Sequence, residues 1–163
     1  MGRSMRSGLR WALVLVGLLA AILIVTFCFP LWVQTQVVRT HLWREGVKSE
    51  YVDAGGYRLH YLEALPANGA AGTPLLLIHG LGAKAEDWSA MIAPLAAQGF
   101  HVYAPDLLGY GRSPKPDVSY SISLEEASVV EFMKAVHVTQ ADVGGWSMGG
   151  WIAMKLAADH PAL

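Results

Sequence analysis

The 163-residue sequence has little charge and almost no cysteine, and both scarcities narrow the classes of protein that it can encode. Lys and Arg number 12 against 13 Asp and Glu, which gives a formal net charge of −1 and no excess of basic residues. A nucleic-acid partner is therefore not expected. The single cysteine, Cys28, excludes a disulfide between two of these residues.

Metal-binding patterns are also missing from the sequence. It contains no cluster of Cys and His at the spacing of metal ligands and no H-E-x-x-H motif. We therefore expect neither a metal ion nor another cofactor.

Apolar residues are abundant, at 53% of the chain, and many of them form one run near the N-terminus. Residues 11–29 contain no charged side chain, and Leu31 to Val33 extend the run beyond Pro30. A bilayer core needs roughly 20 helical residues. The sequence therefore predicts a transmembrane helix over residues 11–33, preceded by a basic tail of residues 1–10.

A cleaved signal peptide is the alternative for this run. The run is longer than a usual signal core, however, and no small-residue cleavage site follows it. Arg3, Arg6 and Arg10 favour a cytoplasmic N-terminus. We thus expect a single-pass membrane protein with a juxtamembrane linker of residues 34–48 and its catalytic part on the outer (periplasmic or extracytoplasmic) side.

Residues 49–163 alternate between strand-like and helix-like patterns. Two β-prone runs flank Gly55-Gly56, which is typical of a hairpin. The alternation that follows predicts an α/β fold with a mostly parallel sheet after this antiparallel hairpin. The strand-like segments are 50–53, 57–63, 74–78, 100–104 and 141–145, and the helix-like segments are 86–97, 123–136 and 151–159.

Three local expectations follow from these patterns. His60, in the second hairpin strand, is expected on the surface of an edge strand. Pro94 is expected to kink or split the helix-like segment around it. Ser123 and Glu126 match a capping box, so Ser123 is expected to open the next helix.

The stretch Gly145-Trp146-Ser147-Met148-Gly149 lies between a predicted strand and a predicted helix. This is the pattern of a nucleophile elbow, a turn so sharp that the serine backbone is strained. Side chains two positions before and after Ser147 would collide, and glycine removes them. The turn is expected to present Ser147 Oγ and to direct the Met148 N–H toward a developing oxyanion.

Two further motifs precede the elbow. His79-Gly80-Leu81-Gly82 follows one predicted strand, and Asp106-x-x-Gly109-x-Gly111-x-Ser113 follows the next. Together with the elbow, this ordered set resembles the α/β-hydrolase fold superfamily. It looks closest to the membrane-anchored serine hydrolases that include monoacylglycerol lipase-like enzymes and esterases, over residues 49–163.

The resemblance implies that Ser147 is the nucleophile and that the backbone N–H groups of Leu81 and Met148 form an oxyanion hole. It implies structural roles for His79 and Asp106. Epoxide hydrolases and haloalkane dehalogenases of the superfamily have aspartate at the elbow, so a serine implies an acyl-enzyme and carboxylic ester substrates, lipid esters among them. The expected partners are a small-molecule or lipid ester and the bilayer.

The resemblance also implies a catalytic acid and a histidine after the elbow. Asp159 and His160 are the candidates of the right type, but at about 1.5 Å per helical residue they lie roughly 18 Å from Ser147. We therefore expect the domain of residues 49–163 to be an incomplete, inactive fragment, truncated after the elbow helix. The alternatives are a perhydrolase, thioesterase or C–C bond hydrolase of the same fold, or a non-catalytic scaffold tethered to the membrane.

Overall fold

The structure, a computed structural model, describes residues 2–67, 69 and 71–163. The side chains of residues 2–7 and 9, which include Arg3 and Arg6 of the expected basic tail, lie outside the described part. The chain divides into two units, Met1–Thr40 and His41–Leu163.

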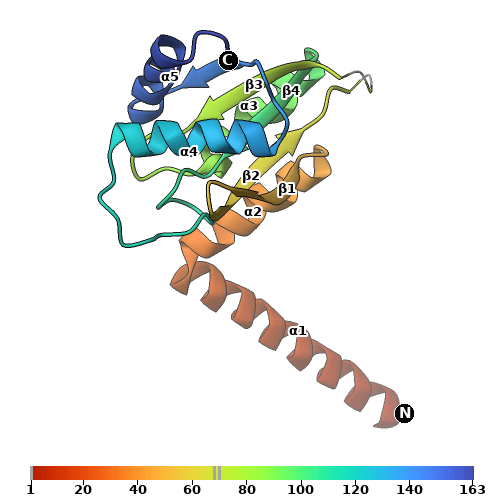
Figure 1. The fold of residues 1–163 in the computed structure, drawn as a ribbon. Coiled ribbons are helices and arrows are strands. Elements are labelled where there is room, and N and C mark those ends of the chain that lie inside the picture. Colours follow the sequence, from red (N-terminus) through yellow and green to blue (C-terminus); the bar gives the residue numbers. More distant parts are fainter. Residues whose placement is uncertain (1, 68, 70) are drawn as a thin grey trace. The chain divides into compact units, whose positions relative to one another are not determined.

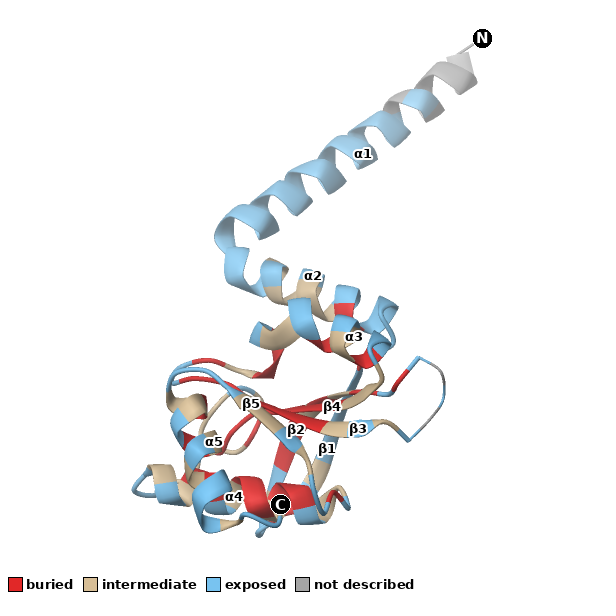
Figure 2. Cartoon of the chain, turned by 90° about the horizontal axis from the view of Figure 1, so that it is seen from above, coloured by how far each residue is buried: buried red, intermediate tan, exposed pale blue. Residues whose placement is uncertain are grey.

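The first unit is helical. Helix α1 spans Gly2–Cys28, and helix α2 begins at Pro30 and ends at Arg44, within the second unit. Arg10–Cys28 is long and apolar enough to cross a membrane, and none of it is buried (Figure 2). The helix expected over residues 11–33 is interrupted at Phe29, because the following proline has no N–H to continue the ladder. Its insertion in a membrane stays a prediction.

The second unit contains a five-stranded sheet in the order β1-β2-β4-β3-β5 (Figure 1). Strands β1 and β2 form the predicted antiparallel hairpin, β2 also runs antiparallel to β4, and β3 runs parallel to both β4 and β5. This confirms the α/β fold with its opening hairpin. The strands are Lys48–Ala54 (β1), Tyr57–Ala64 (β2), Thr73–Ile78 (β3), Phe100–Pro105 (β4) and Asp142–Gly145 (β5).

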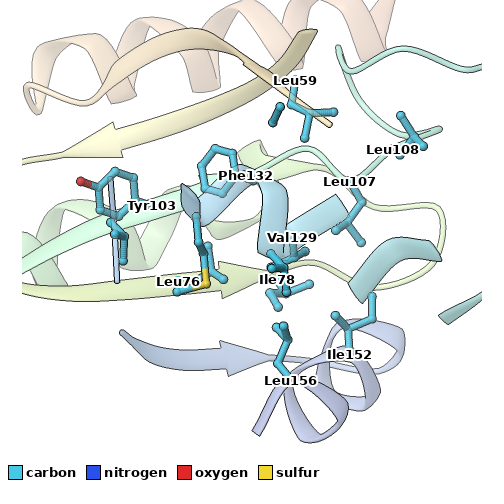
Figure 3. Packing of buried hydrophobic residues seen from close by; sticks show 14 residues of the cluster. Leu59, Leu76, Ile78, Tyr103, Leu107, Leu108, Val129, Phe132, Ile152 and Leu156 are labelled. Carbon is cyan, nitrogen blue, oxygen red and sulfur yellow. The ribbon is translucent and has the colours of Figure 1, made fainter. Parts of the chain in front are cut away.

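Helices cover both faces of this sheet. Figure 2 shows α4 and α5 on one face and α3 on the other. The main core lies beneath α4 and α5, where Phe132, Ile152 and Leu156 pack against Leu76 and Ile78 of β3 (Figure 3). Burying each such side chain contributes about 1.5–3 kcal/mol. The helical elements are the short 3-10 helix η1 (Ala85–Trp88), α3 (Ser89–Ala97), α4 (Ile122–Ala135) and α5 (Met148–Asp159).

The expectation for the second hairpin strand is wrong. Strand β2 is not at the edge of the sheet, because β4 pairs with its second side. Leu59 and His60 are adjacent in sequence and point to opposite faces, yet both are buried. His60 is 0% exposed instead of lying at the surface.

Two expected helix features also differ. The segment around Pro94 is divided at Trp88 and Ser89, where η1 passes into α3, and Pro94 lies inside α3. Helix α4 is capped by Ser121, whose Oγ accepts the Leu124 N–H at 3.1 Å, so Ser123 lies within the first turn. Ser121 stands three residues before Leu124, which is the spacing a capping side chain needs.

Candidate active site

Ser147 occupies the turn between β5 and α5 in a strained backbone conformation. Its φ of 54° and ψ of −124° lie outside the regions that non-glycine residues ordinarily adopt. Ser147 stands at the N-cap of α5, yet its side chain makes no capping hydrogen bond. The hydroxyl is exposed, and within the described part of the chain nothing hydrogen-bonds to it. The predicted elbow geometry is confirmed.

The glycines flanking the elbow are required by contacts with backbone atoms. A Cβ at Gly145 would lie 2.3 Å from Gly149 O, and a Cβ at Gly149 would lie 2.1 Å from Ile78 O. Real Cβ atoms do not approach a carbonyl oxygen this closely. The sequence pattern explains Gly149 by contacts within the elbow. The structure adds a second reason, because a Cβ at Gly149 would collide with the backbone at the end of β3.

The loop after β3 brings Leu81 to the elbow. A Cβ at Gly80 would lie 3.2 Å from Ser147 Cβ, so the Gly80 backbone passes directly beside the serine. The Ala83 N–H donates to Gly80 O at 3.2 Å, and Gly82 has a φ of +72°. This is a β-turn with Leu81 at its second position, whose N–H the turn does not use.

The backbone N–H groups of Leu81 and Met148 are both available to donate a hydrogen bond to a ligand. Neither donates to a backbone carbonyl anywhere in the described residues. Met148 is the first residue of α5, where the helix dipole also favours negative charge. The structure thus places the Gly80–Leu81 turn next to Ser147 and Met148. That the two N–H groups bind an oxyanion stays a prediction.

His79 stabilises the base of this loop. It is 0% exposed, its Nδ1 donates to Gly80 O at 2.8 Å and its Nε2 accepts the Leu107 N–H at 3.0 Å. Burial lowers the pKa of His79, which keeps the ring neutral. Both ring nitrogens are engaged, so His79 has the structural role that the sequence predicted.

Asp106 organises the loop after β4, also as predicted. Its Oδ2 accepts the Arg112 N–H at 2.8 Å and its Oδ1 accepts the Ala85 N–H at 2.7 Å. A Cβ at Gly111, which has a φ of +50°, would lie 2.1 Å from the Asp106 carboxylate. Ser113 Oγ donates to Asp106 O at 2.7 Å and accepts the His60 N–H at 3.0 Å. Asp106, Gly111 and Ser113 of the motif therefore all stabilise this loop.

His60 is a buried residue of this region that the sequence analysis missed. Its Nδ1 lies 2.7 Å from Asp106 Oδ2 and its Nε2 lies 3.1 Å from Ser49 Oγ. The signal was present in β2, where Leu59, Leu62 and Ala64 do not alternate strictly with polar residues. Broken alternation is typical of a strand buried on both faces.

Ser49, His60 and Asp106 have the connectivity of a catalytic triad but lack its other parts. Ser49 is the second residue of β1, an extended strand, whereas Ser147 precedes a helix whose first N–H groups point toward it. The guanidinium Nη1 of Arg112 also donates to Ser49 Oγ at 2.9 Å. The group is better described as a network that links β1, β2 and the loop after β4.

Comparisons with known proteins agree with this architecture. Residues 73–163, more than half of the chain, match the model of the alpha/beta hydrolase fold family. The chain belongs to the alpha/beta hydrolase fold family. This chain is 36% identical over 117 residues to the 2-hydroxy-6-oxo-6-(2'-aminophenyl)hexa-2,4-dienoic acid hydrolase of Metapseudomonas resinovorans, and the match covers 69% of this chain and 38% of that protein. It is 38% identical over 111 residues to Lipase 1 of Psychrobacter immobilis, covering 66% of this chain and 33% of the lipase.

A solved structure extends the likeness further. A membrane phospholipase A, described as a bacterial virulence factor, is similar with a TM-score of 0.73 and 35% identity, over 93% of this chain and 48% of that one. This chain therefore spans about half of the phospholipase structure and about a third of the two curated relatives.

Asp159 and His160 interact with other residues away from the elbow. His160 Nε2 lies 2.8 Å from Glu126 Oε1 of α4, and Asp159 pairs with Lys155 one turn earlier in α5. Both residues stand at the far end of the helix that Ser147 begins. The structure agrees with the prediction that they do not form a triad with Ser147.

Glu125 is a second buried residue that the sequence analysis left unexplained. It is 2% exposed, on the first turn of α4. Burial raises the pKa of its carboxyl to about 7, although a hydrogen bond from the Leu108 backbone opposes the shift. Ionisation of Glu125 near neutral pH therefore lowers the free energy of unfolding of the domain.

Replacing Glu125 should reveal this cost. A raised folded pKa stabilises the protein fully below the unfolded value near 4.5, and that contribution is lost as pH rises through about 7. Glu125→Gln, which stays neutral, should raise the free energy of unfolding by about 1–2 kcal/mol at pH 8 and change it little at pH 5. Denaturant titration at both pH values measures this. Glu131→Gln on the same helix is the control, since the Glu131 carboxylate is partly exposed and pairs with Lys134 at 2.7 Å. An equal gain for Glu125→Gln at both pH values would contradict the explanation.

Proposed function

We propose that this protein is a serine hydrolase that cleaves carboxylic esters through an acyl-enzyme formed on Ser147. The observation that carries the proposal is the exposed Ser147 hydroxyl beside the available N–H groups of Leu81 and Met148. In the first step Ser147 Oγ bonds to the ester carbonyl carbon, and the carbonyl oxygen becomes an oxyanion that the two N–H groups stabilise. The alcohol then leaves with a proton, and water releases the acid.

The base that accepts the serine proton is not supplied by the described histidines. None of them hydrogen-bonds to Ser147 in the described residues, and His60, His79, His101 and His160 are engaged elsewhere. We place the base and its acid partner in the part of the relatives' length that these 163 residues do not cover. The activity proposed is that of the whole protein.

The surroundings of Ser147 favour an apolar acyl group. Leu81 is 71% exposed and Trp146 is 47% exposed, and the Trp146 ring would lie 3.1 Å from a Cβ at Gly80. Two large apolar side chains at the mouth of a site lower the free energy of binding a hydrocarbon chain. This supports lipid esters as substrates.

A C–C bond hydrolase is the second candidate, favoured by the 36% identity to the hexadienoic acid hydrolase. The two differ in leaving group, since the ester releases an alcohol and the dienoate releases a carbon fragment. Measuring turnover of a p-nitrophenyl ester and of a 2-hydroxy-6-oxo-dienoate by the full-length protein distinguishes them.

A fluorophosphonate probe tests the nucleophile. It reacts with an activated serine, so mass spectrometry of the labelled full-length protein should locate the adduct on Ser147. An adduct on Ser49 instead would contradict the proposal and reassign the nucleophile, and the absence of any adduct on the full-length protein would favour a non-catalytic scaffold.

We further propose that Arg10–Cys28 anchors the protein in a membrane, with the hydrolase domain on the outer side. The likeness to the membrane phospholipase A covers 93% of the chain, which is more than residues 41–163 and so includes part of the N-terminal helical segment. Deleting residues 10–28 should move the protein from carbonate-washed membranes to the soluble fraction, and retention of the deleted form would exclude the anchor. Protease protection in sealed vesicles tests the side.

A further inference from the structure

Two buried side chains connect the loop that carries Leu81 with the loop after β4. His79 accepts the Leu107 N–H at 3.0 Å, and Asp106 accepts the Ala85 N–H at 2.7 Å. Leu81 lies between His79 and Ala85 in the chain, so both ends of its loop are attached to the same neighbouring loop. A loop attached at both ends keeps its N–H groups in one place, which an oxyanion hole requires.

Asp106 can accept the Ala85 N–H as a buried, charged carboxylate because other donors also hydrogen-bond to it. The residue is 0% exposed, and an ionised carboxylate at such a position needs several hydrogen bonds. Oδ2 accepts from His60 Nδ1 at 2.7 Å and from the Arg112 N–H at 2.8 Å, which leaves Oδ1 for Ala85. Burial alone would raise the pKa of Asp106, but these hydrogen bonds lower it below its usual value, so the carboxylate stays charged.

His60 connects this carboxylate to the sheet. Its backbone O accepts the Asp106 N–H at 2.9 Å, and its ring is held between Asp106 and Ser49. With Nδ1–H directed at Asp106, the His60 ring sets the position of the carboxylate relative to β2.

We propose that the buried His60–Asp106 pair positions the Leu81 N–H through the hydrogen bond from Ala85 to Asp106, and so tunes the oxyanion hole from outside it. The inference rests on the proposed function of Leu81. His60 and Asp106 are positioning residues in this account and do not touch the substrate.

The chain offers a matched control pair on the same two elements. His101 Nε2 lies 2.7 Å from Glu63 Oε1, so this pair also connects β2 with β4 by a histidine and a carboxylate. Glu63 and His101 lie at the other end of the strand pairing, away from the Leu81 loop. Glu63→Gln therefore breaks a similar contact without releasing Ala85.

The test compares variants of the full-length protein in p-nitrophenyl butyrate hydrolysis and in affinity for a trifluoromethyl ketone, which forms a tetrahedral oxyanion. Asp106→Asn puts an amide NH₂ toward backbone donors, so kcat and ketone affinity should both fall by about 10- to 100-fold, with KM within about threefold. Glu63→Gln should stay within about twofold. His60→Asn, whose amide can donate to Asp106 where Nδ1 does, should retain more activity than His60→Leu.

Amide hydrogen exchange over residues 81–85 gives a measurement that does not depend on catalysis. Exchange should accelerate in Asp106→Asn and not in Glu63→Gln. Unchanged exchange and kcat in Asp106→Asn, equal losses in both variants, or a loss in KM alone would overturn the positioning role. A parent protein whose hydrolysis survives Ser147→Ala would instead overturn the proposed function, and hydrogen exchange would then decide the positioning role by itself.

Discussion

Gly149→Ala is expected to destabilise the folded domain by about 3–5 kcal/mol, because the new Cβ would lie 2.1 Å from Ile78 O. His79 O would also lie only 2.6 Å away. These oxygens belong to the backbone at the end of β3 and cannot rotate aside as a flexible side chain could. Either β3 or the start of α5 must shift, and both define the elbow.

Gly150→Ala is the matched control for this prediction. It lies in the same helix turn, and the nearest atom to its Cβ would be Gly145 O at 3.3 Å. Its effect should stay within about 1 kcal/mol, since alanine's helix propensity offsets a mild contact. Denaturant unfolding of both variants measures the difference, and similar midpoints would show that the Gly149 contact does not restrain the fold.

Ser147→Ala is expected to lower kcat for ester hydrolysis by about 10⁴- to 10⁶-fold in the full-length protein. The substitution removes the Oγ atom that we propose bonds to the carbonyl carbon, while Leu81 and Met148 keep their N–H groups. Binding of the ester should change little, so the loss should appear in kcat. Alanine also keeps the Cβ beside Gly80, so the loop has no reason to move.

Ser49→Ala distinguishes the two candidate nucleophiles, the hydrogen-bonded Ser49 and Ser147, whose hydroxyl has no hydrogen-bond partner among the described residues. Ser49 accepts from Arg112 and lies 3.1 Å from His60 Nε2, so it has the connectivity of a nucleophile without the convergent N–H groups. Its replacement should leave kcat within a few fold. A large loss for Ser49→Ala together with a small one for Ser147→Ala would reverse the assignment.

The parts of the fold that could be predicted from the sequence are those whose conformation is determined by residues close together in the chain. Gly145 and Gly149 flank a serine that must adopt a positive φ, and the glycine pattern records that requirement. The apolar run of β3 and the Gly55-Gly56 hairpin are local in the same sense. The roles expected for Ser147, Leu81 and Met148 are consistent with the geometry and stay predictions until the variants are measured.

The parts that could not be predicted depend on which segments become neighbours. The broken alternation in β2 indicates burial on both faces, but residues 57–63 do not identify β4, some 40 residues later, as the strand that pairs with β2. The same distance in the chain separates Asp106 from His60 and explains why their contact was missed. The start of α4 differs by two residues, since Ser121 and Ser123 are both residues that suit a cap and the structure uses Ser121.

The close approach of Gly149 to the end of β3 also makes the elbow depend on the formation of the sheet. Strand β3 pairs with β4 and β5, which come later in the chain, so the elbow has its template only after all three strands have met. An unfolded or half-folded polypeptide contains Ser147 but lacks the pairing of β3 with β5 that holds the strained bend. We therefore expect the proposed reactivity of Ser147 to appear only once these strands have paired.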